Sequence, residues 1–174
     1  SYGERTVLEL TPEQGSIGEW YYAAGKLIVR RYHAEATPPV NELIAFAWTP
    51  DQREPLALGS GVTLPFIYPR EFIYAFGPHG DNIVAASNMG GVHVFDGRAW
   101  KTLRIVDPKT SFQVYSTLNT ADRLLLGQYP TGELFEFTGN ELRRLPAQPP
   151  VMKGVSGSAR EAQTLALYGG DIYA

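Results

Sequence analysis

The chain has 174 residues, with 15 basic and 18 acidic side chains and a formal net charge of -3. The length predicts one domain. The mildly negative charge gives no positive field that would attract nucleic acid or an anionic membrane, and we expect neither partner. The absence of cysteine excludes disulfides, thiol nucleophiles and cysteine-bound zinc, while the compartment stays open. The longest apolar stretches are far shorter than the roughly 18 residues that span a bilayer, and we expect a soluble or already processed chain.

The composition predicts an all-β protein. The sequence holds 18 Gly, 13 Pro, 10 Tyr and 8 Phe, and aromatic residues favour strands that Gly and Pro end. Helix signals are weak. We interpret residues 158–167, the one stretch with a helix-like composition, as a loop that leads into a strand.

The first predicted four-stranded unit covers residues 17–58. Its strands lie in "SIGEWYYAAGKLIVRRY", "NELIAFAW" and "PLALG", and "TVLEL" at residues 6–10 is expected as a further outer strand. The unusual stretch at residues 19–32 holds Trp20, Tyr21, Tyr22, Arg30, Arg31 and Tyr32. Its aromatics could form a platform for sugars or bases, but the alternation equally describes a buried inner strand with a basic rim, which we favour.

The next stretch is a repeat. "DNIVAASNMGGVHVFDGRAWKTL" at residues 81–103 returns in pattern at residues 122–145, with Ile83 matching Leu124 at a separation of 41 residues. Each copy is predicted as a hairpin followed by a third strand, and Asp96-Gly97 is a two-residue hairpin signal. One more apolar run precedes each copy. The units therefore cover residues 71–105 and 111–145, and another begins at residues 163–174.

Four strands per unit at this period are typical of propeller blades. We predict a β-propeller of about three and a half four-stranded blades, whereas a ring of six or seven would need about 250 to 290 residues. The chain is then a fragment of a larger ring, which we favour because "GDIYA" has the pattern of an interrupted strand. The alternatives are a homodimer that completes one ring, or a four-bladed ring closed by "TVLEL".

The repeats also carry a family likeness. The well-matched positions are Ile83, Gly91, Val92, Phe95, Asp96, Gly97 and Trp100, and the looser ones are Leu124, Gly132, Leu134, Phe137 and Gly139. They resemble the propeller repeats of bacterial sensor proteins of the two-component-regulator type and their kelch-like relatives, with the pattern G-x-I-W-I-G-T, a glycine turn and G-L-x-R-Y-D-G. The position that is aromatic in the family's strand is occupied by Val84 in the first copy and by Leu125 in the second. In the third copy it is aromatic again, as Tyr173. Sensors, lectins, lyases and hydrolases share such repeats, so the resemblance implies a fold and not an activity.

Long loops gather on one predicted face of the disc. These are the connections at residues 59–70, 106–110 and 146–161, together with the turns at residues 88–89 and 128–130. Long loops on a rigid scaffold are the usual place for recognition. The candidate ligand-binding residues are therefore Phe66, Tyr68, Arg70, Asn88, Lys109, Gln128, Tyr129, Lys153 and Arg160.

Catalytic and metal motifs are absent from the pattern. The histidines His33, His79 and His93 lack ligand spacing, so we predict no metal and no cofactor, and we expect His93 to make a hydrogen bond in the core. Glu133 and Glu136 should point to opposite faces of a strand, so they are expected as solvated or paired ions rather than a catalytic pair.

Three functional hypotheses follow from these patterns. The first is a non-catalytic recognition module for a glycan, peptide or small metabolite, with Tyr68 and Tyr129 close together on an exposed surface. The second is a carbohydrate-active enzyme, a glycoside hydrolase or polysaccharide lyase, whose catalytic residues lie largely outside this chain. The third is a structural scaffold in an assembly.

Overall fold

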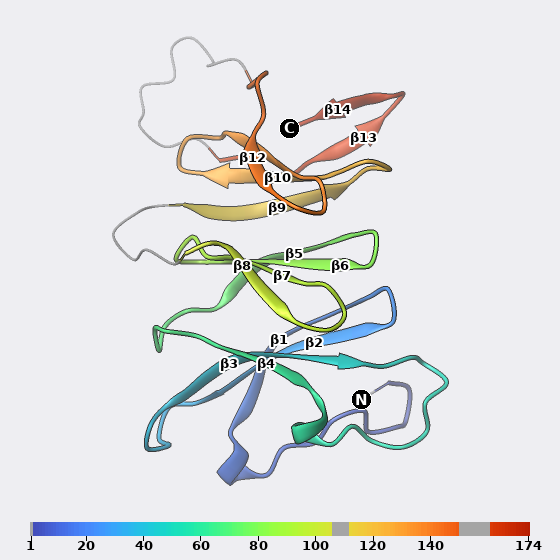
Figure 1. Ribbon diagram of the computed structural model, residues 1–174, viewed down its shortest axis with the longest axis vertical. Helices are drawn as coiled ribbons and strands as arrows, with labels where there is room; N and C mark the ends of the chain where they lie inside the picture. Colours follow the sequence, from blue (N-terminus) through green and yellow to red (C-terminus); the bar gives the residue numbers. More distant parts are fainter. Residues whose placement is uncertain (1, 106–111, 150–160) are drawn as a thin grey trace. The chain divides into compact units, whose positions relative to one another are not determined.

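The computed structural model describes residues 2–105, 112–149 and 161–174 and divides into two compact units (Figure 1). Unit 1 is Ser1–Phe72 with Phe95–Trp100, and unit 2 is Ile73–Val94 with Lys101–Ala174. Strands dominate both units, and the described residues contain two short 3-10 helices, η1 (Pro12–Gln14) and η2 (Leu58–Ser60), but no α-helix. The prediction of an all-β protein is confirmed. None of these helices is long and apolar enough to cross a membrane.

Unit 1 is built on one antiparallel sheet, which we call sheet I. Its strands follow one another in chain order as β1 (Ser16–Ala23), β2 (Lys26–His33), β3 (Val40–Ala47) and β4 (Val62–Pro65). One face of the sheet carries a core of Leu27, Val29, Ile44, Phe46 and Trp48. Tyr22 of β1 packs against this core, and so do Val7, Leu8, Leu56 and Leu58 from segments outside the sheet.

Two predictions for unit 1 were wrong. The fourth strand is Val62–Pro65 and does not lie in "PLALG", and "TVLEL" contributes only an isolated bridge from Leu8 to Leu56. The physical reason is the same in both cases. Val7, Leu8, Leu56 and Leu58 are apolar because they pack onto the core of sheet I, and not because they alternate along a strand.

Unit 2 holds two further sheets and a hairpin. Sheet II is β5 (Ile73–His79), β6 (Asn82–Ser87), β7 (Val92–Phe95) and β8 (Trp100–Arg104), although the tip of its β7–β8 hairpin is grouped with unit 1. Sheet III is β9 (Gln113–Asn119), β10 (Leu124–Tyr129), β11 (Leu134–Phe137) and β12 (Leu142–Arg144). The hairpin is β13 (Ala166–Tyr168) with β14 (Asp171–Tyr173). Figure 1 shows that every sheet is a meander of consecutive strands.

The turn at Asp96 differs in position from the predicted two-residue hairpin. The backbone N–H of Asp96 donates a 3.2 Å hydrogen bond to the carbonyl of Ala99, so the two central residues of the turn are Gly97 and Arg98 rather than Asp96 and Gly97. One carboxylate oxygen of Asp96 accepts hydrogen bonds from the backbone N–H groups of Arg98 and Ala99, each at 2.8 Å. The predicted hairpin turn is therefore present but shifted by one residue, and the Asp96 side chain closes it as the first residue of the turn.

Sheets II and III pack face to face inside unit 2. Val84, Ala86, Val92 and Val94 of sheet II share one apolar core with Leu124, Leu126 and Phe137 of sheet III. Close approach depends on a glycine, because a Cβ at Gly77 would lie 2.7 Å from the Leu124 side chain. The Thr117 hydroxyl also donates a 2.8 Å hydrogen bond to the carbonyl of Phe76, which ties β9 to β5.

The second face of sheet III is covered by the chain that precedes β13. Leu125 and Leu134 pack there with Ala162 and Leu165. Gly127 marks the closest point, because a Cβ on it would lie 2.6 Å from the Ala162 carbonyl oxygen. The inner strand β10 is therefore buried on both faces, which is why it shows an apolar run rather than an alternation.

Two buried polar side chains of unit 2, Glu136 and His93, have hydrogen-bond partners. Glu136, with 2% of its surface exposed, accepts hydrogen bonds from Arg123 at 2.9 Å and from Arg143 at 2.6 Å. The buried ring of His93 lies 3.0 Å from the Thr102 hydroxyl through Nδ1. The predictions of a paired Glu136 and of a core hydrogen bond at His93 are confirmed.

We predict that Gly127→Ala destabilises unit 2 by about 1–3 kcal/mol, because the new methyl group has to displace backbone rather than a flexible side chain. Denaturant unfolding of the variant and of the wild-type chain measures the difference. Gly59→Ala is the matched control, since a Cβ at Gly59 meets nothing within 4 Å. An equal stability of Gly127→Ala and wild type would contradict the packing described for β10.

The Glu136 ion pairs should make stability depend on pH. Hydrogen bonding to Arg123 lowers the pKa of the Glu136 carboxyl below its ordinary 4.5. The charged form therefore stabilises the fold above pH 4.5, and this contribution is lost as the pH falls through the depressed pKa. We expect Glu136→Gln to lose about 1–2 kcal/mol at neutral pH, discounted for the partly exposed arginines, and the difference from wild type to shrink as the pH falls below 4.5.

Urea unfolding across that pH range tests the Glu136 prediction. The control is Glu141→Gln, because Glu141 is an exposed carboxylate 3.9 Å from the same Arg143. Its effect should stay within about 0.5 kcal/mol at every pH. A pH-independent difference between Glu136→Gln and wild type would show that the charge of Glu136 is not what stabilises unit 2.

Candidate functional site

The structure describes six of the nine predicted site residues. Lys109, Lys153 and Arg160 lie outside the described residues. Phe66, Tyr68 and Arg70 belong to unit 1, whereas Asn88, Gln128 and Tyr129 belong to unit 2. Because the two groups belong to different units, the expected proximity of Tyr68 and Tyr129 stays a prediction.

In unit 1, the loop after β4 is anchored by Asn41. The buried amide of Asn41 donates hydrogen bonds to the carbonyls of Tyr68 at 3.0 Å and Glu71 at 2.8 Å, and its oxygen accepts one from Arg30 at 2.9 Å. A hollow of about 380 Å³ opens beside this loop, and Phe66 lines it with Arg31 and Glu42. Tyr68 is half-buried and Arg70 is exposed.

In unit 2, the predicted residue Tyr129 is part of a group of three rings, which we call the tyrosine cluster (Tyr74, Tyr115 and Tyr129). The centroids of Tyr74 and Tyr115 lie 5.0 Å apart in an edge-to-face arrangement, and those of Tyr115 and Tyr129 lie 5.7 Å apart and stacked. The cluster is accessible, since Tyr74 is 41% exposed and the other two are half-buried. These distances are those at which aromatic pairs attract one another.

Two β-bulges position the cluster. In β5 the register passes from Ile73 to Ala75 against consecutive residues of β6, so Tyr74 is the extra residue. In β9 the same happens at Tyr115, opposite the step from Gly127 to Gln128. A bulge turns its side chain away from the regular alternation of the strand. Tyr74 and Tyr115 are 41 residues apart, so the repeat places both rings at equivalent positions.

Amides and hydroxyls form hydrogen bonds beside the cluster. The Tyr115 hydroxyl donates to the side-chain oxygen of Gln113 at 2.8 Å. Gln128 is buried, and its side chain is used within the turn, where it accepts from the Thr131 hydroxyl at 2.6 Å and donates to the carbonyl of Tyr129. Gln128 therefore shapes the turn that carries Tyr129. Asn88 lies half-buried in the β6–β7 turn and belongs to no ring contact of the cluster.

Burial controls the ionisation of the cluster. It raises the pKa of the Tyr115 phenol above its ordinary 10.0. The neighbouring groups Tyr74, Glu161 and Tyr129 add to the shift in that order. The phenol consequently stays protonated and can donate a hydrogen bond at any physiological pH.

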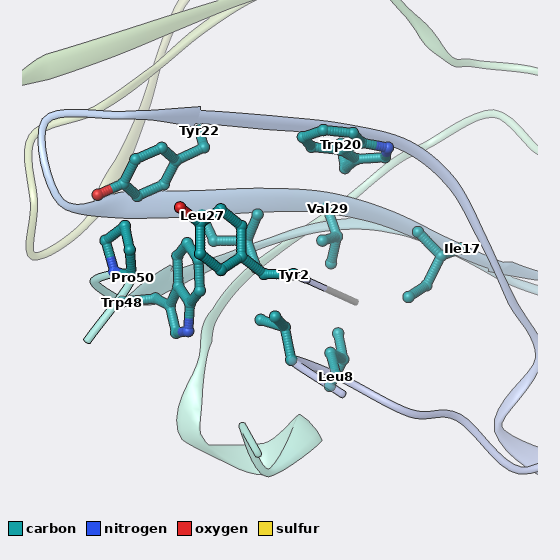
Figure 2. A pocket seen from close by; sticks show the side chains of 10 residues that line it. Tyr2, Leu8, Ile17, Trp20, Tyr22, Leu27, Val29, Trp48 and Pro50 are labelled. Atoms are coloured by element: carbon teal, nitrogen blue, oxygen red, sulfur yellow. The ribbon is translucent and has the colours of Figure 1, made fainter. Parts of the chain in front are cut away.

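Unit 1 carries a second aromatic surface (Figure 2), which we call the sheet I pocket. This hollow of about 510 Å³ is lined by Tyr2, Val7, Leu8, Ile17, Trp20, Tyr22, Leu27, Val29, Trp48 and Pro50. Trp48 stands edge-on to Tyr22 at 5.2 Å and to Tyr2 at 5.7 Å. Figure 2 shows Trp20 and Tyr22 along one strand, with Leu8 across the hollow.

The interpretation of residues 19–32 as a buried inner strand was wrong for β1. Trp20 is 69% exposed, and no residue of β1 is fully buried. Strand β1 is an edge strand whose aromatic side chains face a hollow rather than a packed sheet. Sequence alternation is the same in both situations, because it reports which face a side chain occupies and not what covers that face.

Sequence reasoning missed Tyr74 and Tyr115, although a signal was present. Both fall in the first strand of a repeat, and the 41-residue period aligns them. Their neighbours Ile73, Ala75 and Val114 are buried, so the two tyrosines looked like ordinary members of the alternation. Only the β-bulges direct the two tyrosine rings to one cluster, and no residue type in the sequence predicts these bulges.

We predict that Tyr115 ionises later than an ordinary tyrosine. In a chain labelled with ¹³C at the tyrosine ring carbon that bears the oxygen, the Tyr115 resonance, assigned with Tyr115→Phe, should titrate with a pKa above 10.0. Replacing Glu161 by Gln should lower that pKa, since a neighbouring negative charge is removed. A Tyr115 resonance that titrates at or below 10.0 would show that the ring is not buried in the cluster.

Comparisons with known proteins give no family. No family model matches the chain, and no curated protein matches it. Within the described ranges, no group of three or more His, Asp or Glu side chains is arranged to hold a metal ion. The tyrosine cluster and the sheet I pocket are therefore the features of the described residues that bear on function.

Proposed function

We propose that the chain is a segment of a β-propeller in which sheets I, II and III are consecutive blades, as the resemblance to sensor-type and kelch-like repeats implies. Each sheet is a meander of four strands in chain order, which is how a blade is built. In unit 2 the first strands of two sheets, β5 and β9, lie side by side and are joined through Thr117 and Phe76. This contact supports the proposal, because the first strands of neighbouring blades meet around the axis of a propeller.

Within that fold, we propose that the chain is a non-catalytic recognition module that binds a neutral glycan at the tyrosine cluster. The observation that carries this proposal is the meeting of three rings from β5, β9 and β10, two of them on bulges one repeat apart. Aromatic faces stack on the C–H faces of sugar rings, and amides and hydroxyls bind sugar hydroxyls.

The surroundings of the cluster favour a neutral ligand over an acidic one. The Glu161 carboxylate is close enough to raise the pKa of Tyr115, so it would also repel a bound carboxylate or sulfate. A protonated phenol at Tyr115 donates a hydrogen bond rather than accepting a proton, which suits recognition better than general-base catalysis.

The test is binding of uncharged oligosaccharides to the 174-residue chain. We would measure saturation-transfer NMR and calorimetric titration with cello-, malto-, xylo- and chito-oligosaccharides. We expect at least one of them to bind, and Tyr74→Ala or Tyr115→Ala to weaken it about tenfold or more through the loss of ring stacking. Tyr32→Ala is the matched control, since Tyr32 is an equally exposed tyrosine in unit 1.

The possible results separate the hypotheses. Binding that the cluster variants abolish and Tyr32→Ala preserves supports a glycan site at the cluster. Binding that is unaffected by Tyr74→Ala and Tyr115→Ala would place the ligand elsewhere. The absence of binding to every neutral sugar, or preferential binding of a peptide library or of uronic acid oligomers, would overturn the proposed ligand class.

A further inference from the structure

The sheet I pocket is an apolar surface that is only half covered. Val7, Leu8, Leu56 and Leu58 pack against the core on this face. Over β1 it is open, and Trp20 is largely exposed although its cross-strand partner Val29 is buried. A tryptophan left in water beside a hollow of this size indicates a surface that another group covers.

The strand register shows which face of sheet III corresponds to the face of sheet I that carries the pocket. In each sheet, a tight turn joins the first strand to the second. Leu27 of sheet I and Leu124 of sheet III both directly follow the residue pair that closes this turn, so they occupy equivalent positions. Leu27 is opposite Phe46 in β3, as Leu124 is opposite Phe137 in β11. In unit 2, that face of sheet III is the one on which sheet II packs.

The side chains of sheet II that cover this face are known. Gly77 lies against Leu124, the ring of His79 stands edge-on to Phe137 at 5.8 Å, and Val84 belongs to the same core. Gly77 is the cross-strand partner of Val84, and His79 that of Asn82, on the two strands that flank a two-residue turn.

The β13–β14 hairpin has the same register as the β5–β6 hairpin, but the side chains on its corresponding face are exposed. Its turn is also two residues long, so Ala166, Tyr168 and Tyr173 occupy the positions of Gly77, His79 and Val84. Tyr168 is 78% exposed and Tyr173 is 54% exposed. Ala166 pairs with Tyr173, and Tyr168 lies two residues from Ala166, so all three share one face of the hairpin.

We propose that the β13–β14 hairpin of one copy of this chain docks on the sheet I pocket of a second copy. The hairpin has two strands, and the strand residues that line the pocket come from the two strands β1 and β2. Tyr168 and Tyr173 enter the hollow beside Trp20 and Tyr22, in the relation that His79 and Val84 have to sheet III. The two surfaces are different patches of one chain, so the pairing is head-to-tail.

The test measures self-association of the 174-residue chain by sedimentation velocity over a wide concentration range. We expect concentration-dependent association that Trp20→Glu and Tyr168→Glu each weaken roughly tenfold or more. Both side chains are exposed, so neither substitution should change the thermal melting of the isolated chain. Ile105→Glu, at an exposed apolar residue outside both surfaces, is the matched control and should associate like wild type.

Mixing the two variants gives the decisive result. Trp20→Glu retains an intact hairpin and Tyr168→Glu retains an intact pocket, so an equimolar mixture should form a one-to-one heterodimer although each variant alone is monomeric. A wild-type chain that stays monomeric at every concentration overturns the proposal. So does association that neither variant weakens, or a mixture of the two variants that forms no heterodimer.

Discussion

The burial of both faces of each inner strand is the constraint on which the structure depends. Ile83 to Ala86 in β6 and Leu124 to Leu126 in β10 are buried without interruption, and Leu27 to Val29 in β2 follow the same rule. A strand that is apolar on both sides needs a cover on each face, and in unit 2 the cover is a second sheet or the chain before β13. Each four-stranded meander contains such an inner strand, so the same need for two covered faces recurs in every sheet. That is why the pattern of burial recurs along the chain while the residues change.

The same constraint explains where function can arise. Side chains that follow the alternation of the inner strands are mostly used in packing, and the tyrosine cluster and Trp20 are accessible because they lie outside that alternation. Tyr74 and Tyr115 escape through bulges, Tyr129 lies at the end of a strand, and Trp20 is on an edge strand. The first three converge on one cluster with amide and hydroxyl neighbours, which suits a polar ligand that has apolar faces. Trp20 instead borders a hollow with few polar groups, which suits another piece of protein. The two surfaces therefore differ in chemistry as well as in position.

Much of the fold could be predicted from the sequence, and the failures have physical causes. The repeat at residues 81–103 and 122–145 marks β6, β7, β10 and β11 because apolar runs and turn glycines are local signals. The fourth strand of sheet I was misplaced because Leu56 and Leu58 are apolar for a tertiary reason, as covers of the core. Of the predicted site residues, Tyr129 lies in the tyrosine cluster and Phe66 lines a hollow, whereas Gln128 is used inside a turn. Tyr74 and Tyr115 could be found only by combining the 41-residue period with a bulge, which depends on the pairing of strands and not on residue type.

The bulged tyrosines of two neighbouring sheets meet in one cluster, and the proposed site depends on this contact. The most direct measurement is a nuclear Overhauser experiment on a chain in which only the tyrosine rings carry protons, with assignments from Tyr74→Phe, Tyr115→Phe and Tyr129→Phe. We predict strong ring-to-ring cross-peaks between Tyr74 and Tyr115, whose ring centroids are 5.0 Å apart, and between Tyr115 and Tyr129, whose ring centroids are 5.7 Å apart. The absence of both cross-peaks in a folded chain would contradict the register of β5 and β9, and with it the site.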